Sequence, residues 1–228
     1  MISSTSVICP AWQAAATLAD TLASVSGQTL RPLEILVVDD GSTDETATVG
    51  KASGANVICR PHSGAAAALN AGIAASRGEL LAFIDADDLW PADKLAMQTA
   101  MLTADPNLAG VLGLMQCFVS PEEEPNAKVR YRLPDTLQQA WLTGALLVRR
   151  GAVERIGPFD EAMLAGFAID WFDRGRRLGF AFAMPRRVVL LRRIRTGSLS
   201  HRSPQRDKGY ALMAWQAVQR RRDGRNAK

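Results

Sequence analysis

The stretch from residue 80 to residue 91 constrains the fold of this chain more than any other. Five apolar residues, Leu80 to Ile84, run directly into the carboxylates Asp85, Asp87 and Asp88. An uncharged run of this length is typical of a central strand in a parallel sheet. The acids then fall at the carboxyl end of the strand, where open α/β sheets bind ligands. Asp85 and Asp87 leave an extended chain on the same side and suit a hard cation such as Mg²⁺ or Mn²⁺. The alternative is a solvated turn that caps the next helix, with Pro91 in its first turn.

Strand and helix patterns alternate along the chain before this stretch. The strands are expected at residues 6–10, 33–38, 55–59 and 80–84, and the helices at 14–26, 42–52 and 65–76. Ser42-x-x-Glu45 is a capping-box pattern at the start of the second helix. Four strands that alternate with helices predict an α/β fold with a doubly wound, mainly parallel sheet flanked by helices. Asp39 and Asp40 end the second strand, so carboxylates again lie at a carboxyl end.

The pattern is less regular after Asp105. We expect strands at residues 108–119, 143–149 and 188–191, helices at 151–156 and 166–178, an exposed loop at 120–126 and a basic turn at 192–195. No linker is long enough to split the chain, which indicates a single domain. Within it, residues 1–104 form one half, residues 105–200 form a second half, and residues 201–228 form a basic C-terminal helix.

Charge is distributed unevenly between the two halves. Residues 1–104 carry 11 acids and 5 bases (−6), whereas residues 105–228 carry 12 acids and 22 bases (+10). A basic half that faces an acidic half, whose carboxylates could bind a metal ion, suits a phosphate-ester ligand. The basic residues form no recognised nucleic-acid signature, so nucleic acid is not an expected partner.

Cysteine usage and hydropathy indicate the compartment. Cys9, Cys59 and Cys117 lie far apart in apolar runs, as expected in a reducing environment, and no C-x-x-C pair occurs. No leader and no run that could span a bilayer is apparent, so we expect a cytoplasmic protein. The basic tail at 220–228 is a candidate for peripheral contact with the anionic inner face of a membrane. The sequence predicts no oligomeric state.

Several motifs resemble, in order and spacing, those of family 2 glycosyltransferases with the GT-A fold. The motifs of the first half are Val7 to Gln13, Glu34 to Asp44, His62-Ser63-Gly64 with Asn70-x-Gly72, and Asp85-Ala86-Asp87-Asp88 as the D-x-D element. Gly157 to Glu161, followed by Asp170-Trp171, resembles the acceptor half of that family. The resemblance covers roughly residues 5–200.

This resemblance implies a metal-dependent transfer of a sugar, with inversion, from a nucleotide-sugar donor to an acceptor hydroxyl. A UDP-sugar is favoured, and the acceptor is not identified. Asp87 and Asp85 would hold Mn²⁺ or Mg²⁺, and Asp170 would be the general base. The residues expected to bind the nucleotide and donor are Pro10, Ala11, Asp39, Asp40, His62, Gly64, Asn70, Asp85, Ala86, Asp87, Arg192 and Arg193.

Each role has a simpler alternative. Asp39 and Asp40 would also suit a turn, and Asp170 could simply pair with Arg174 one helical turn later. We interpret His201 as a surface residue rather than as a third metal ligand. The sequence departs from the family pattern at three positions that bear on metal and phosphate binding, namely Leu69 (often Arg), Ile169 (often Glu) and Arg195 (often His).

Other function classes fit less well. A nucleotide-sugar-binding protein with little or no turnover is the main alternative, because of these departures. A nucleotidyltransferase normally has a Gly-rich basic loop after its first strand, whereas residues 10–16 contain neither Gly nor a base. A receiver-like signalling module would need a later Lys, and residues 145–200 contain none.

Overall fold

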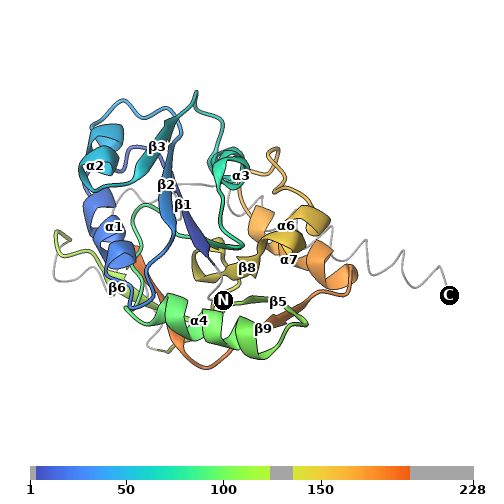
Figure 1. The fold of residues 1–228 in the computed structure, drawn as a ribbon. Helices are drawn as coiled ribbons and strands as arrows, with labels where there is room; N and C mark the ends of the chain where they lie inside the picture. Colours follow the sequence, from blue (N-terminus) through green and yellow to red (C-terminus); the bar gives the residue numbers. More distant parts are fainter. Residues whose placement is uncertain (1–3, 124–135, 196–228) are drawn as a thin grey trace.

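The computed structural model describes residues 4–123 and 136–195 (Figure 1). Strands and helices alternate in the first half, as the sequence predicts. In chain order they are β1 (Thr5–Ala11), α1 (Leu18–Ser26), β2 (Glu34–Asp39), α2 (Thr46–Ala52), β3 (Asn56–Cys59), α3 (Ala65–Ala75), β4 (Leu80–Phe83) and α4 (Lys94–Ala104).

The second half contains shorter elements. They are β5 (Leu108–Val111), β6 (Leu114–Val119), β7 (Gln138–Gln139), the 3-10 turn η1 (Thr143–Ala145), β8 (Leu147–Arg149), α6 (Arg150–Ile156), α7 (Phe167–Arg177), β9 (Ala181–Ala183) and β10 (Val188–Ile194). None of the helices within the described ranges has the length and apolar character needed to cross a bilayer.

Seven strands form the main sheet in the order β3-β2-β1-β4-β8-β5-β9. The pairs among β3, β2, β1 and β4 are parallel, while β8 runs antiparallel to both of its neighbours. In Figure 1, α1, α2 and α4 lie on one side of this sheet and α3, α6 and α7 on the other. The predicted fold class, a mixed but mainly parallel doubly wound sheet in a single domain, is therefore confirmed. The division into the ranges 1–104, 105–200 and 201–228 stays a prediction.

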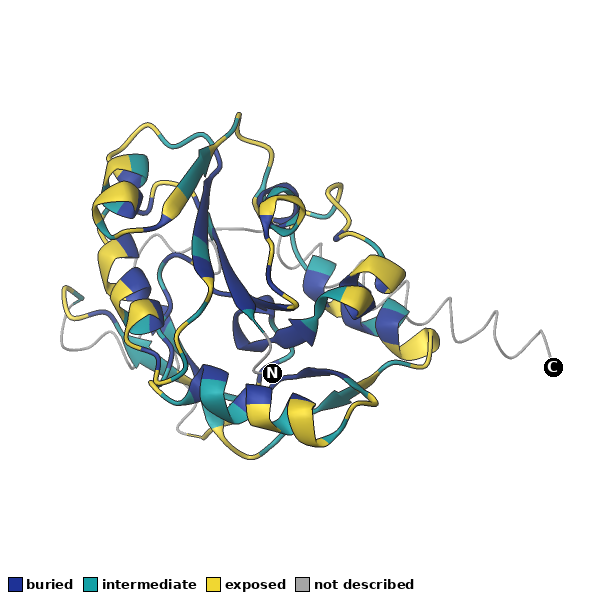
Figure 2. Ribbon diagram, in the orientation of Figure 1, coloured by how far each residue is buried: buried dark blue, intermediate teal, exposed yellow. Residues whose placement is uncertain are grey.

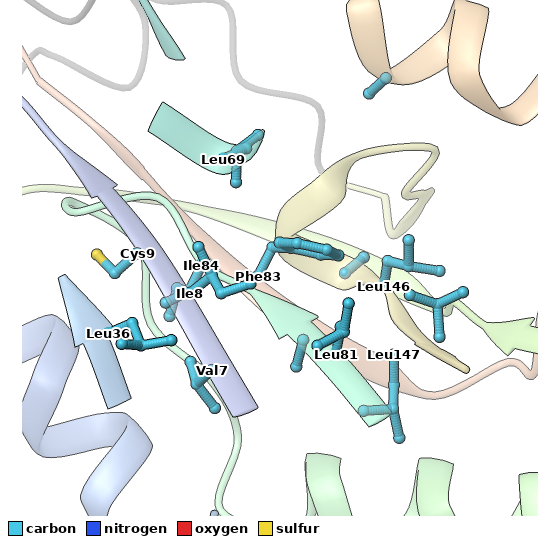
Figure 3. Close-up of a cluster of buried hydrophobic side chains, with 14 of the residues drawn as sticks. Val7, Ile8, Cys9, Leu36, Leu69, Leu81, Phe83, Ile84, Leu146 and Leu147 are labelled. Atoms are coloured by element: carbon cyan, nitrogen blue, oxygen red, sulfur yellow. The ribbon is translucent and has the colours of Figure 1, made fainter. Parts of the chain in front are cut away.

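The core lies along the central strands of this sheet. These strands are buried along their length, whereas the helices expose their outer faces (Figure 2). Figure 3 shows Val7 and Ile8 of β1 beside Leu36 of β2 and beside Leu81 and Phe83 of β4. All five side chains are at most 4% exposed. This apolar centre fixes the strand ends that carry the polar residues of the site.

The prediction of a single strand at residues 108–119 is wrong. The chain turns at Leu112 and Gly113, so that β5 joins the main sheet and β6 pairs with β10 in a second, three-stranded sheet. Gly113 permits the turn, because a Cβ there would lie 2.7 Å from the Val189 side chain. Periodicity does not reveal this break, since both strands are apolar.

Three other local predictions need correction. The strand expected at residues 143–149 begins only at Leu147, because Thr143–Ala145 form the turn η1. The Ser42-x-x-Glu45 box does not cap α2; the Ser42 hydroxyl instead accepts a hydrogen bond from the Gln13 backbone N–H. The basic turn predicted at residues 192–195 is largely strand, because β10 extends to Ile194. The predicted C-terminal helix at 201–228 and His201 lie outside the described residues.

Candidate active site

The carboxyl ends of β2, β1 and β4 meet at one edge of the main sheet. These strands are parallel, with β1 in the middle; Ala11 at its end pairs with Asp39, and Pro10 pairs with Val38. Asp85 follows β4 on the other side of β1. Two strand spacings separate the ends of β2 and β4, or about 10 Å. Two acidic segments therefore face one edge at a separation that a nucleoside diphosphate can span.

The acidic turn that follows β4 is held on two sides. On one side, α1 donates from the Thr17 hydroxyl to the Ala86 carbonyl (2.9 Å) and from the Thr21 hydroxyl to the Asp88 carbonyl (2.8 Å). On the other side, the backbone N–H of Arg193 donates to Asp88 Oδ1 (2.9 Å). Asp88 is buried and serves the structure of the turn, but it does not cap α4, which begins six residues later.

Repulsion and burial both act on the acidic turn. Burial, followed by the neighbouring charge of Asp87, raises the pKa of Asp85 to about 6, although Arg192 opposes the shift. Solvent still reaches the Asp85 side chain, so the carboxylate is crowded by protein but accessible to a ligand. Burial and the charges of Asp85 and Asp87 also raise the pKa of Asp88. The acidic turn therefore carries more negative charge than the nearby basic side chains neutralise.

The donor set at this turn fits a divalent cation that keeps most of its ligands as phosphate and water. Among the described residues, no three His, Cys, Asp or Glu side chains come together as a complete metal site. Asp85 and Asp87 supply two carboxylates near the chain surface. Mg²⁺ and similar ions are commonly bound by one or two carboxylates plus substrate phosphates. The predicted pair therefore has suitable chemistry for Mn²⁺ or Mg²⁺.

Arg192 and Arg193, both expected to bind the donor, have different surroundings. The charge of Arg192 acts on Asp85, which places it close to the acidic turn. Arg193 is only 4% exposed, and its guanidinium donates to the Asp87 carbonyl (2.8 Å), to the Ser120 hydroxyl (3.0 Å) and to Asp20 (3.1 Å). Arg193 therefore holds the turn in place in this structure, and contact with a donor would require these bonds to change.

Asp39 and Asp40 also differ. Asp39 Oδ1 accepts a hydrogen bond from the Ser42 N–H (3.0 Å) at the end of β2. Asp40 is buried, as Asp39 also is, and its carboxylate accepts bonds from the N–H groups of Ser63 (3.1 Å) and Gly64 (2.7 Å). Asp40 thus anchors the loop before α3, whereas Asp39 stands at the strand end itself. Gly64 precedes α3 with a φ of 98°, a conformation that favours glycine.

An exposed aromatic residue, Trp12, lies next to these acids and is absent from the predicted site. Its ring stacks on His62, with centroids 4.7 Å apart and an angle of 28°. His62 in turn lies 2.9 Å from Asp40 through Nδ1. Trp12 is 44% exposed, which is unusual for so large an apolar ring. The signal in the sequence is an aromatic residue directly after the first strand.

Asn70, expected to bind the donor, joins the two halves of the chain. Its amide donates to the Phe159 carbonyl (2.9 Å) and to Glu161 Oε1 (2.8 Å), and its carbonyl accepts from the Phe159 N–H (3.0 Å). The loop from Gly157 to Glu161 is thereby fixed to α3. Asn70 therefore positions the loop that leads to α7.

Asp170 lies in the first turn of α7 and pairs with Arg174, as the simpler alternative anticipates. Arg174 Nε is 2.9 Å from Asp170 Oδ2, and the same guanidinium donates to the carbonyls of Ile156 (2.8 Å) and Pro158 (2.7 Å). These bonds hold the Asp170 carboxylate in a defined orientation. Ile169, where the family often has Glu, is 41% exposed.

Aromatic packing connects Asp170 to the strand that carries the acidic turn. Phe83, the last residue of β4, packs edge to face against Phe159, with ring centroids 5.9 Å apart. Phe159 packs against Trp171, the neighbour of Asp170, at 5.6 Å. The Trp171 indole N–H also donates to the Gly157 carbonyl (2.9 Å). The start of α7 is therefore fixed relative to the end of β4.

The fold and this arrangement of acids suit a glycosyltransferase, and comparison with known proteins identifies the family. The family model described as "Glycosyl transferase family 2" matches residues 6–152, more than half of the chain. The chain belongs to glycosyltransferase family 2, as the motifs predict.

Known relatives and solved structures agree with this assignment. An uncharacterized glycosyltransferase of Nostoc sp. is 30% identical over 68% of this chain and 53% of its own length. The Escherichia coli UDP-Glc:alpha-D-GlcNAc-diphosphoundecaprenol beta-1,3-glucosyltransferase WfaP is 34% identical over 41% of this chain and 39% of its own length. The chain thus spans about half, or less, of the length of these relatives.

Two solved structures share the fold. The mannosyltransferase PcManGT from Pyrobaculum calidifontis, in complex with GDP-Man and Mn²⁺, is 26% identical, with a TM-score of 0.65 over 87% of this chain and 59% of that chain. Staphylococcus aureus TarS in complex with UDP-GlcNAc has a TM-score of 0.71 at 17% identity, over 88% of this chain and 61% of that chain. The second similarity concerns the fold alone.

Proposed function

We propose that this chain transfers a sugar from a nucleoside-diphosphate sugar to an acceptor hydroxyl, with inversion and with the help of Mn²⁺ or Mg²⁺. The observation that carries the proposal is the edge of the sheet where Asp39 and the acidic turn lie on either side of β1. A UDP-sugar is the favoured donor. WfaP, a relative, is named for a UDP-sugar donor, and the solved PcManGT holds a nucleotide sugar with Mn²⁺.

The nucleoside would lie at the ends of β1 and β2. Asp39 would accept hydrogen bonds from the base, next to Pro10 and Ala11 of β1. Trp12, exposed and stacked on His62, offers a flat apolar surface to the base or ribose. Asp40 and Gly64 would act indirectly, because their mutual bond shapes the loop that carries His62.

The diphosphate would lie at the end of β4, beside Asp85, Ala86 and Asp87. A bound cation there would neutralise the charge that develops on the leaving nucleoside diphosphate. Asp87 and Asp85 would hold it through their carboxylates, and Arg192 would add positive charge from β10.

Asp170 would accept the proton of the acceptor hydroxyl. Inversion requires a base on the face of the sugar opposite the leaving group, within hydrogen-bonding reach of the attacking oxygen. Arg174 would orient the carboxylate. The same ion pair also favours the second candidate, a nucleotide-sugar-binding protein with little turnover, because Arg174 already occupies Asp170 Oδ2.

A hydrolysis screen of UDP-, GDP- and dTDP-sugars with Mn²⁺ tests the proposal without knowledge of the acceptor. We expect slow hydrolysis of one donor, lost when the metal is chelated and in Asp87→Ala. Binding of a donor without hydrolysis would favour the second candidate. Neither binding nor hydrolysis of any donor would contradict both.

A further inference from the structure

Arg195, directly after β10, lies beside the carboxylate that would hold the cation. Its Nε is 3.7 Å from Asp87 Oδ2, and both side chains are 25% exposed. This is an ion pair but not a hydrogen bond. Arg195 Nε is buried and has no hydrogen-bond partner within the described part of the chain. A buried N–H without an acceptor is unfavourable, so the pairing satisfies the charge of Arg195 but not its Nε–H.

The backbone keeps Arg195 at this position. Leu191 of β10 and Leu89, just after the acidic turn, exchange two backbone hydrogen bonds, of 2.8 and 2.9 Å. Arg193 donates from its side chain to the Asp87 carbonyl (2.8 Å). Arg195 comes two residues after Arg193, just past the end of β10, and its guanidinium reaches the same turn. The proximity of Arg195 to Asp87 is therefore built into the fold.

Arg195 and a divalent cation would compete for Asp87. Two positive charges on one carboxylate repel each other, and the repulsion is strong where protein excludes much of the water. A diphosphate group would remove the conflict, because the planar fork of a guanidinium matches phosphate oxygens.

We propose that Asp87 exchanges its cationic partner when a nucleoside diphosphate binds. Without a ligand, Arg195 pairs with Asp87 and weakens the binding of a metal ion alone. With the diphosphate present, Arg195 turns its N–H groups to the phosphate oxygens and leaves Asp87 to the metal. Metal and diphosphate then bind cooperatively, with Arg195 as the coupling residue. This inference rests on the proposed function, since it assumes a nucleoside diphosphate at the end of β4.

Calorimetry on the full chain tests the exchange by titrating Mn²⁺ alone and then UDP in the presence of Mn²⁺. Arg195→Gln removes the charge at this position. Arg187→Gln is the matched control. It also removes one positive charge, but Arg187 pairs with the exposed Asp93 and not with Asp87. Arg195→Lys keeps the charge without the planar fork, and circular dichroism shows whether each variant is folded.

Opposite changes in the two affinities are the expected result. Arg195→Gln binds Mn²⁺ alone about tenfold more tightly and UDP with Mn²⁺ about tenfold more weakly, whereas Arg187→Gln changes neither. Arg195→Lys keeps the weak affinity of the wild type for Mn²⁺ alone. If Arg195→Gln leaves the affinity for Mn²⁺ alone unchanged or weakens both affinities, the exchange is wrong even though the wild type binds UDP. If the wild type itself binds no UDP with Mn²⁺, the proposed function fails as well.

Discussion

The side-chain amide of Asn70 makes hydrogen bonds in both directions with the backbone of Phe159, 89 residues further along the chain. This contact fixes the loop before α7 to α3, and Phe159 also packs against Phe83 at the end of β4. One residue thus connects the nucleotide half with the half that carries Asp170. The expected direct role of Asn70 in donor binding and this positioning role predict different results.

Asn70→Ala is expected to lower the rate of donor turnover while leaving the affinity for UDP nearly unchanged. The variant loses the bonds to the loop and becomes less stable by about 1–3 kcal/mol, because buried backbone groups of Phe159 lose their partner. Calorimetry with UDP and thermal unfolding measure the two effects. Asn56→Ala, at an exposed position of β3, is the control. A large loss of UDP affinity would favour direct contact with the donor instead.

Asp170→Asn is expected to retain UDP binding and to lower sugar transfer by about 10²- to 10⁴-fold, the usual contribution of a general base. Asn keeps the shape of the side chain but cannot accept the proton. Transfer assays and UDP titrations separate the two steps. Asp173→Asn, which removes a carboxylate paired with Arg177 on the same helix, serves as the control. If Asp170→Asn transfers sugar at the rate of the wild type, the base lies elsewhere.

Lys94 leads to a prediction about stability. Its side chain is fully buried, its Nζ donates to Gln98 Oε1 (2.8 Å), and its ammonium lies 4.1 Å from the centroid of the Trp90 ring. Burial lowers the pKa of Lys94 well below its ordinary value of 10.5. Lys94 therefore holds its proton more tightly in the unfolded chain than in the folded chain. As a result, the free energy of unfolding rises with pH between the lowered pKa and 10.5.

Lys94→Met avoids burial of an amine but leaves the buried Gln98 Oε1 without its donor, so we expect it to raise the free energy of unfolding at neutral pH by no more than about 1 kcal/mol. The advantage should shrink as the pH rises toward 10, where the unfolded wild type also loses its proton. Thermal unfolding at a series of pH values measures this difference. A constant difference across that range would show that titration of Lys94 is not its cause.

Much of the first half could be predicted from its sequence. Each strand there is a short apolar run, and each helix has its own spacing, so local patterns and tertiary structure agree. The acids at the strand ends follow directly from this alternation. In Leu108 to Val119, by contrast, both strands are apolar, and only the contact of Gly113 with Val189 shows where the chain changes sheets.

The roles of individual polar residues were harder to predict. Sequence places Asp39 and Asp40 together, but only the structure shows that Asp40 is engaged by the Ser63 and Gly64 N–H groups. Arg193 follows Arg192 in sequence, but only Arg193 is buried, where it bonds to Asp87, Ser120 and Asp20. A basic run in sequence does not reveal which of its members is buried, because that depends on the strand with which it pairs.

The central claim is that Asp87 carries a cation that strengthens the binding of a nucleoside diphosphate. Calorimetric titration of UDP, with and without Mn²⁺, measures it directly in the wild type, in Asp87→Ala and in the control Asp93→Ala, whose carboxylate is exposed and pairs with Arg187. We predict that Mn²⁺ increases the affinity of the wild type and of Asp93→Ala for UDP about tenfold or more, and that Asp87→Ala loses most of this gain. Equal affinity with and without metal in the wild type, or a full gain in Asp87→Ala, would contradict the account.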